Sequence, residues 1–515
     1  MGKHRVIRGI VTIHRWMGLV LSLFLGMWFL SGFVMLYTDF PGYGEARRRM
    51  DAEVLGAPGG IALPAGQAGG GGARALAGPF VVLRFSRLLD RTVWVGERPD
   101  GTVVAGYAGG PVTGDSLGIG RLVTGDSLLV VDQPMAEAIA GRHFLGRYRP
   151  ERTDILHELD QWIPRSHFLV HMPIYRIRMN DPASSWIYIS SRTGEIVQLH
   201  TRRERVLAWL GPIPHWIYPR DLIVRRPLWR VVVIVVSAAG SVMCLSGIVA
   251  GIVRLRRRRT GQRGRQGAGR RTGKETGQAA GPYASPYKKK WMRWHHYTGL
   301  VFGLFTFTWV FSGLLSMNPF RWSSEPGSEE VRVWQGGESG GAAVLPVAGE
   351  DVVEIRLVKL QGKRYYLYYT KAGSSFIRDG DRRFPYFDKE LLVSGLQKLV
   401  PGAPVAEASL IRREDNYYYS KDHSQPLPVW KIRFADARQT WFYVDPATGT
   451  ILNKYDKTGR MNRWLYHGFH SMDLSWLMQR RPLWDVVIIF LLLGGTGVSL
   501  TGIVLTVKWI RRRTS

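Results

Sequence analysis

The chain carries the same histidine-headed apolar segment twice, near its start and just past its middle. HRWMGLVLSLFLGMWFLSG begins at His14, and HHYTGLVFGLFTFTWVFSG begins at His295. Two further apolar runs each follow an RRPLW sequence, and a histidine precedes each of them, at His215 and His470. A long segment that recurs with its polar residues in the same places predicts two related halves.

The four apolar runs are long enough to cross a bilayer, whose hydrocarbon core of about 30 Å needs about 20 residues of helix. The runs are Gly18 to Tyr37, Trp229 to Val253, Gly299 to Met317, and Trp484 to Val507. We therefore predict a membrane protein with four transmembrane α-helices in two duplicated halves. Each half is expected to insert an outward-facing α+β domain between its two helices.

The formal net charge of +30 is concentrated beside the apolar runs, as in RLRRRR from Arg254 and KKK from Lys288. This distribution is typical of the cytoplasmic ends of transmembrane helices and argues against a nucleic-acid partner. With four spans, it predicts a multi-pass protein of the bacterial inner membrane, with both termini cytoplasmic and both large domains periplasmic. The arginines of the two RRPLW sequences fall on the outer side. The preference of basic residues for the cytoplasmic side is weak there, because long translocated domains lie beside them.

Two hairpins occur at the same distance before the second and fourth runs. WIYISSRTGEIV begins at Trp186 and WFYVDPATGTIL begins at Trp441, each with an aromatic strand, a glycine-containing turn and a second strand. Residues 56–78 and the basic segment after the second run are glycine-rich, and both are expected to lack regular structure. The predicted boundaries are 1–37 for the cytoplasmic N-terminus and first span, 38–205 for the first periplasmic domain, 206–253 for an interfacial segment and second span, 254–290 for a basic cytoplasmic linker, 291–317 for the third span, 318–460 for the second periplasmic domain, 461–507 for an interfacial segment and fourth span, and 508–515 for the cytoplasmic tail.

The chain resembles the PepSY-associated transmembrane family in these motifs. That family begins a helix with HRW-x-G, places Ser-Gly near its far end, and has an external hairpin of the form W-x-Y-[IV]-D-P-x-T-G. The segment from Trp441 fits this form, whereas the segment from Trp186 has Ser190 and Ser191 in place of Asp-Pro. Some members are similar to inner-membrane ferric-siderophore reductases that carry b-type haem, so the resemblance implies a redox role.

Four histidines are the leading candidates for haem ligands. His14 and His295 each have a glycine one helical turn further on, Gly18 and Gly299, which would let a porphyrin lie against the helix. The alternative for this pair is a histidine that only sits at the membrane interface. His215 and His470 form the matching outer pair. Because two axial histidines saturate haem iron, two such haems would relay electrons across the membrane.

Other residues are second choices. His296 and His467 lie beside leading candidates, and His171 and His423 precede matching strands of the outward domains. The spacing of His467 and His470 also allows a zinc or copper site, although no nearby acidic or thiolate set completes it. Five arginines could pair with haem propionates or equally with lipid headgroups: Arg15, Arg225, Arg226, Arg480 and Arg481.

These observations predict a di-haem ferric-chelate reductase. Cys244 is the one cysteine, which excludes an iron–sulfur cluster and a cysteine-attached haem. No dinucleotide fingerprint stands out, so an unidentified cytoplasmic donor must supply the electrons. The expected partners are the lipid bilayer, that donor, and a ferric siderophore or other iron chelate outside. The alternative is a non-enzymatic PepSY scaffold or sensor that binds peptides or regulates a protease; a transporter has little support, because no ionisable residue lies deep in the spans.

Overall fold

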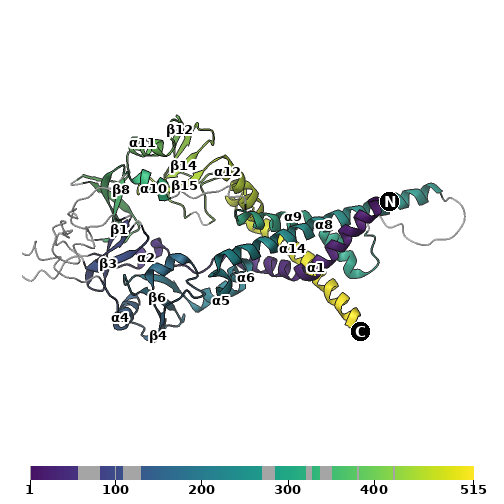
Figure 1. The fold of residues 1–515 in the computed structure, drawn as a ribbon, viewed down its shortest axis with the longest axis horizontal. Helices are drawn as coiled ribbons and strands as arrows, with labels where there is room; N and C mark the ends of the chain where they lie inside the picture. Colours follow the sequence, from purple (N-terminus) through teal and green to yellow (C-terminus); the bar gives the residue numbers. More distant parts are fainter. Residues whose placement is uncertain are drawn as a thin grey trace, which may run out of the picture. The chain divides into compact units, whose positions relative to one another are not determined.

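The computed structural model describes residues 2–55, 80, 82–98, 100–107, 129–268, 285–319, 328–336, 351–379, 382–421 and 424–514. They form two compact units, each built from several stretches of chain. The helical unit comprises Met1–Asp39, Leu207–Ser323 and Thr458–Ser515. The strand-rich unit comprises Phe40–Val206 and Ser324–Lys457. Figure 1 shows their elements.

The helical unit contains four helices long and apolar enough to cross a membrane, which confirms the four predicted runs. They are α1 (Gly2–Met35), α8 (Arg226–Ala268), α9 (Lys290–Ser316) and α14 (Leu483–Thr514). The helices extend beyond the apolar runs, so His14 lies three turns inside α1 rather than at a helix start. Helix α8 continues to Ala268, and the expectation that the basic linker lacks regular structure is therefore wrong for its first residues.

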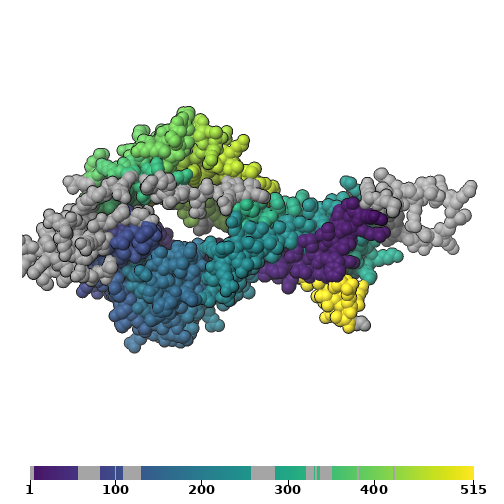
Figure 2. Space-filling view, in the orientation of Figure 1, coloured from purple at the N-terminus to yellow at the C-terminus, as the bar shows by residue number. Residues whose placement is uncertain are grey.

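Close contacts between glycines and large side chains hold the four helices together. An added Cβ on Gly494 would meet the Phe302 ring at 2.1 Å, and one on Gly495 would meet the Phe29 ring at 2.3 Å. These two glycines let α14 pack between α1 and α9, as small residues commonly do between membrane helices. The first turns of α1 lie beside the last turns of α14, where Trp16 and Trp509 have ring centres 5.5 Å apart. Figure 2 shows the end of α14, in yellow, projecting from the surface of this unit.

Short helices precede α8 and α14 and carry the outer histidines. Before α8 come α5 (Arg202–Leu210), α6 (Pro212–His215) and α7 (Arg220–Ile223). Before α14 come α12 (Lys457–Arg463), the π-helical turn η3 (Trp464–Gly468) and α13 (Ser475–Met478). The first of these segments packs on α1 and the second packs on α9.

Within the described residues, the strand-rich unit contains three antiparallel sheets. A seven-stranded sheet has the order β11-β10-β9-β8-β1-β2-β3, and two four-stranded sheets have the orders β4-β5-β6-β7 and β12-β13-β14-β15. The strands are β1 (Val82–Leu88), β2 (Arg91–Glu97), β3 (Val103–Tyr107), β4 (Pro150–Leu156), β5 (Ile174–Met179), β6 (Trp186–Ser190), β7 (Ile196–His200), β8 (Val352–Leu360), β9 (Lys363–Thr370), β10 (Ser375–Asp379), β11 (Arg382–Phe384), β12 (Val405–Ile411), β13 (Val429–Phe434), β14 (Trp441–Val444) and β15 (Ile451–Tyr455). The helices of this unit are α2 (Glu45–Asp51), α4 (Gln133–His143), the 3₁₀ turn η2 (Ser166–His171), α10 (Ser328–Gln335) and α11 (Lys389–Leu399).

The seven-stranded sheet combines strands from both polar stretches of the chain. Strand β1 pairs with β8, with Phe85 opposite Ile355. The two polar stretches therefore form one compact unit, in which strands of both predicted domains share a sheet. Burial explains the union, because Phe85 and Ile355 are both fully buried at this junction.

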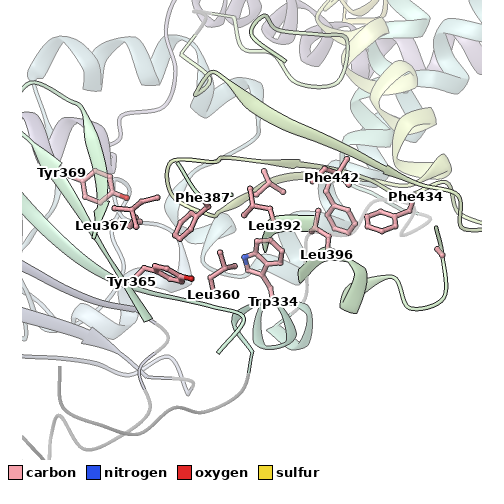
Figure 3. Packing of buried hydrophobic residues seen from close by; sticks show 14 of the residues in the cluster. Trp334, Leu360, Tyr365, Leu367, Tyr369, Phe387, Leu392, Leu396, Phe434 and Phe442 are labelled. Atoms are coloured by element: carbon pink, nitrogen blue, oxygen red, sulfur yellow. The ribbon is translucent and has the colours of Figure 1, made fainter. Parts of the chain in front are cut away.

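Both predicted hairpins are present as antiparallel pairs, β6 with β7 and β14 with β15. Each turn contains a glycine with a left-handed backbone, Gly194 at φ +69° and Gly449 at φ +68°. Glycine is the residue that adopts this conformation without steric cost. The Gly449 carbonyl also accepts a hydrogen bond of 3.0 Å from the Trp334 indole, which closes a core formed with Phe387 and Leu392 (Figure 3).

Candidate functional site: two histidine pairs in the helical unit

The inner pair joins His14 of α1 to His295 of α9. Their rings are stacked, with centres 6.1 Å apart and planes inclined by 29°. Nδ1 of His14 lies 3.0 Å from the Met243 carbonyl of α8, and Nδ1 of His295 lies 3.0 Å from the Thr501 hydroxyl of α14. All four long helices therefore take part in positioning this pair.

A glycine on the facing helix makes room for the His14 ring. An added Cβ on Gly247 of α8 would lie 2.5 Å from Cε1 of His14, a distance that real side chains do not tolerate. On α14, an added Cβ on Gly502 would make only an ordinary contact, 3.7 Å from Cε1 of His295. By contrast, an added Cβ on Gly18 or Gly299 would meet nothing within 4 Å among the described residues.

The outer pair joins His215, at the end of α6, to His470, just after η3. Their ring centres are also 6.1 Å apart, but the planes are inclined by 76°. Nδ1 of His215 lies 3.1 Å from the Ser31 hydroxyl and 3.2 Å from the Trp28 carbonyl. Both acceptors belong to the last two turns of α1, which therefore fixes the ring.

The partner ring is fixed in the same way by α9. Nδ1 of His470 lies 3.1 Å from the Ser312 hydroxyl and 3.2 Å from the Trp309 carbonyl. The Ser-Gly sequence near the end of each first helix thus has a defined role, which is to hold the histidine that follows the polar stretch.

The hydrogen bonds assign the tautomer of each imidazole. Carbonyl oxygens can only accept, so His14 donates from Nδ1 to Met243. The hydroxyl of Ser31 donates to the Trp28 carbonyl at 3.1 Å, and therefore accepts from His215. Ser312 and Thr501 likewise donate to backbone carbonyls of their own helices and accept from the other two histidines. A histidine that donates from Nδ1 presents the lone pair of Nε2, which is the arrangement of most metal-binding histidines.

The separation of the rings agrees with two imidazoles that share one metal ion. Metal–imidazole bonds of about 2.0 Å place the two nitrogens about 4 Å apart and the ring centres about 6 Å apart. Both pairs have this separation. Among the residues that the structure describes, no three His, Cys, Asp or Glu side chains cluster as a metal site would require. Two imidazoles at this separation could serve a centre that takes two protein ligands.

Two tryptophans near the outer pair have buried indole nitrogens. Nε1 of Trp28 and Nε1 of Trp309 are inaccessible to solvent and find no hydrogen-bond acceptor in the described part of the chain. A buried donor without a partner costs about 1–3 kcal/mol. Trp28 and Trp309 also supply the carbonyls that contact His215 and His470, so both orphaned donors belong to residues that position the outer pair.

The comparison with known families identifies one part of the strand-rich unit. Residues 389–455 match the family model PepSY, described as peptidase propeptide and YPEB domain. These residues form a PepSY domain. It consists of α11 and the sheet β12-β13-β14-β15. No curated protein matches the chain.

A half-buried carboxylate, Asp415, organises the PepSY domain. Asp415 accepts hydrogen bonds from the Tyr443 hydroxyl at 2.9 Å and from the Lys431 amine at 2.7 Å. The Lys431 amine also lies 4.7 Å from the centre of the Trp441 ring. Burial alone would raise the pKa of Asp415, but the hydrogen bonds and charge of Lys431, with the Tyr417 and Tyr418 amides, lower it.

The second-choice histidines make contacts of their own. His296 is buried, with Nε2 3.2 Å from the Gly251 carbonyl of α8. His467 is nearly half exposed, and its Nδ1 lies 3.9 Å from an Asp473 oxygen. His171 belongs to the strand-rich unit, where Nδ1 lies 3.2 Å from the Ser190 hydroxyl. His423 lies outside the described residues.

The five arginines considered as propionate partners are exposed: Arg15, Arg225, Arg226, Arg480 and Arg481. Arg481 forms an ion pair of 2.6 Å with Asp485 and stacks on Trp484. Arg15 lies over the Trp16 ring. These contacts fit side chains at a membrane surface, whereas the indole nitrogens of Trp28 and Trp309 are buried.

Sequence reasoning did not identify several residues that position the histidines. Thr501 and Met243 belong to no recognisable motif. Ser246, however, occupies the place in the second run that Thr501 occupies in the fourth, and its hydroxyl donates to the Met243 carbonyl at 2.8 Å. The recurrence of Ser31 and Ser312 was the available signal for the outer pair. The same spacing relates Trp28 to Trp309.

Proposed function

We propose that this chain is a haem-containing oxidoreductase of the bacterial inner membrane, built from two duplicated halves. Each histidine pair would hold one b-type haem. Electrons would pass from a cytoplasmic donor, by way of the two centres, to a periplasmic acceptor, for which a ferric siderophore or other iron chelate is the candidate. The observation that carries this proposal is that all four histidines occur in pairs 6.1 Å apart, each with Nδ1 committed to a protein acceptor.

The duplication is supported by matching contacts in the two four-stranded sheets. In the sheet β4-β5-β6-β7, Asp160 accepts hydrogen bonds from the Tyr188 hydroxyl at 2.8 Å and from Arg176 at 3.2 Å. This is the arrangement of Asp415, Tyr443 and Lys431 in the PepSY domain, with the same intervals between the three residues. The Arg176 guanidinium also lies over Trp186, as Lys431 lies over Trp441.

A haem with two axial histidines passes single electrons and leaves no open position for oxygen. The protein would contribute three properties. The neutral Nε2 of each histidine would bind iron, and the hydrogen bond at Nδ1 would fix the plane of the ring and raise its basicity. The indole groups of Trp28 and Trp309 would donate to the carboxylates of the outer group, replacing water in a buried site.

The distribution of charge supports the direction of electron flow. Basic residues such as Lys508 and Arg254 occur near the ends of the long helices, on the side where Figure 1 shows both termini. Lys508 lies over Trp291, and Arg254 lies over Tyr287, so the basic ends of α8, α9 and α14 are near the inner histidines. Cytoplasmic ends of membrane helices have this composition. His14 and His295 would therefore receive electrons, and His215 and His470 would deliver them.

The absorption spectrum of the purified full-length protein tests this proposal. The expected result is a Soret band with sharp α and β bands on reduction, and a pyridine haemochrome assay giving two b-type haems per chain. The exposed His157 provides a control, and His157→Ala should have the wild-type spectrum. A protein expressed with adequate haem supply that shows no Soret band would contradict the proposal.

The PepSY match favours a second candidate, a membrane scaffold that binds peptides or restrains a protease. In that case the histidines would be packing residues at the membrane interface. The variant His14→Ala with His295→Ala would then retain peptide binding, and neither this variant nor the wild type would carry haem. The same spectrum therefore separates the two candidates.

A further inference from the structure

Three arginines without carboxylate partners gather on one face of the sheet β4-β5-β6-β7. They are Arg178 of β5 and Arg202 and Arg205 of α5. None of the three forms an ion pair with a described residue, and the side chains of Arg178 and Arg202 donate no hydrogen bond to that part of the chain. All three belong to the strand-rich unit, so the cluster is defined within that unit alone.

Trp186 of β6 is the residue around which these side chains are arranged. It is half-buried and lies directly opposite Arg178 in the sheet. The guanidinium carbon of Arg205 lies 4.3 Å from the centre of the Trp186 ring, and that of Arg178 lies 5.6 Å from it. Arg205 also donates to the Ser184 carbonyl at 2.9 Å and to the His200 carbonyl at 3.2 Å. Because an indole ring attracts cations, Trp186 brings two like charges to one place.

The charges of this cluster repel one another. Arg202 and Arg205 are three residues apart on α5 and therefore lie on the same helical face. Burial lowers the pKa of Arg205, and the charges of Arg178 and Arg202 lower it further. The nearest carboxylates are engaged elsewhere: Asp181 accepts from a neighbouring serine, and Glu204 caps the start of α5. An anion from outside the chain would relieve this repulsion.

The corresponding surface of the PepSY domain is neutralised. There, Arg433 lies opposite Glu407 on the neighbouring strand and pairs with it at 2.7 Å. At the same places in the sheet β4-β5-β6-β7, Arg178 lies opposite Arg152, whose own ion pair is with Asp154. Like charges directly opposite each other on neighbouring strands are destabilising. The first sheet therefore lacks a stabilising pair where the second has one, and the fold itself does not require the positive charge.

Helix α5 indicates the source of the anion. Arg202 is its first residue, and three apolar residues further along, Val206, Trp209 and Leu210, are each at least half exposed. The C-terminal half of α5 belongs to the helical unit, which contains the four candidate spans. Exposed cations at one end and exposed tryptophan and leucine at the other are typical of a helix at a membrane surface. Such a helix meets the phosphate groups of phospholipids.

We propose that Arg178, Arg202 and Arg205 form a binding site for a phosphate group, and that a phospholipid headgroup supplies it. Guanidinium groups bind phosphate oxygens through paired, charge-assisted hydrogen bonds. Arg178 and Arg202 have all their side-chain donors available for these bonds, and Arg205 adds a fixed positive charge. Neither histidine pair takes part, so the inference does not depend on the proposed oxidoreductase function.

Native mass spectrometry of the full-length protein released from detergent tests the inference, because it counts bound molecules and gives their affinities. The probes are dioleoyl-phosphatidylglycerol, dioleoylglycerol, which has the same chains without the phosphate, and glycerol 3-phosphate, which has the phosphate without the chains. We expect one phosphatidylglycerol per chain to bind about tenfold more tightly than dioleoylglycerol, as charged hydrogen bonds predict. Glycerol 3-phosphate should bind more weakly than the lipid.

The two sheets provide matched variants. Arg178→Gln with Arg202→Gln should weaken binding of this phosphatidylglycerol about tenfold. Arg433→Gln with Lys457→Gln removes the same number of charges at the corresponding positions of the other half and should leave it unchanged. Arg152→Glu places a carboxylate opposite Arg178, as in the PepSY domain, and should weaken binding while the melting temperature is kept.

The outcomes separate the alternatives. Wild-type affinity in Arg178→Gln with Arg202→Gln, or equal affinity for dioleoylglycerol and phosphatidylglycerol, would overturn the proposal. An equal loss in Arg433→Gln with Lys457→Gln would also overturn it, because the lipid would then follow total charge. Glycerol 3-phosphate that binds as tightly as the lipid, and depends on Arg178, would confirm the phosphate site and identify a soluble phosphate as its source.

Discussion

The hydroxyl of Ser31 lies 3.1 Å from Nδ1 of His215, although the two residues belong to different elements and a whole polar stretch of chain separates them. Ser312 and His470 have the same contact at the same distance. Each serine also donates to a carbonyl of its own helix, so its hydroxyl can only accept from the ring. A short polar contact at each of these two histidines thus fixes Nδ1 as the nitrogen that donates.

Removing this contact should loosen the outer centre. In Ser31→Ala with Ser312→Ala, the histidines keep only the carbonyl acceptors, and we expect haem affinity to fall at least tenfold, as loss of such supporting hydrogen bonds typically does. Transfer of haem to apomyoglobin measures this. Thr308→Ala is a control, because the Thr308 hydroxyl bonds only to its own helix. Unchanged transfer rates in the double serine variant would show that the serines do not support a haem ligand.

The two histidine pairs should be separable by mutation. His14→Ala with His295→Ala should remove about half of the Soret absorbance, and His215→Ala with His470→Ala should remove the other half, since each haem needs both of its axial ligands. Redox titration of each variant should then show a single midpoint potential instead of two. Loss of all absorbance from either variant, with the protein still folded by circular dichroism, would contradict two independent centres.

Replacing a buried indole should have different effects on the haem-free and the haem-loaded protein. In haem-free protein, Trp28→Phe or Trp309→Phe removes an unsatisfied donor, and the protein should keep its stability or gain about 1–3 kcal/mol. In haem-loaded protein, the same change should weaken haem retention. Trp16→Phe is the control, because Trp16 is 48% exposed. Equal effects with and without haem would show that the indoles do not contact the group.

Much of this architecture was predictable because repetition in the sequence carries long-range information. Because His14 and His295 occupy the same place on equivalent helices, the sequence predicts that both lie at the same end of the spans. Hydropathy predicts the four spans themselves. The hairpins from Trp186 and Trp441 followed from local turn chemistry. Each of these features depends on residues that are close in sequence or repeated within it.

The remaining features depend on pairings that no local pattern encodes. Strand β1 has the alternation of any half-buried strand, and nothing in it indicates β8 as its neighbour, so the shared sheet was not predicted. The acceptor for His14 is the backbone carbonyl of Met243, which any residue at that position would supply. The sequence around Glu195 suggests a surface turn, yet Arg48 and Arg84, which are distant in sequence, both form ion pairs with it.

The strand-rich unit should lose stability in mild acid through His200. This side chain is fully buried, with its ring 4.9 Å from Trp162 and 5.5 Å from Tyr188. Burial, reinforced by the charge of Arg205, lowers its pKa from 6.5 to about 3. The folded protein therefore keeps His200 neutral, whereas the unfolded chain takes up a proton below pH 6.5.

The free energy of unfolding should consequently fall as the pH drops from 6.5 towards 3, by about 2 kcal/mol at pH 5 for this group alone. The melting temperature, followed by the near-ultraviolet circular dichroism of the tryptophans, should fall by roughly 5 °C between pH 7.5 and pH 5. His200→Phe keeps an aromatic ring in the cluster and should flatten this dependence, whereas His157→Phe, at an exposed position, should preserve it. A pH profile of His200→Phe that overlays the wild type would show that another group controls acid stability.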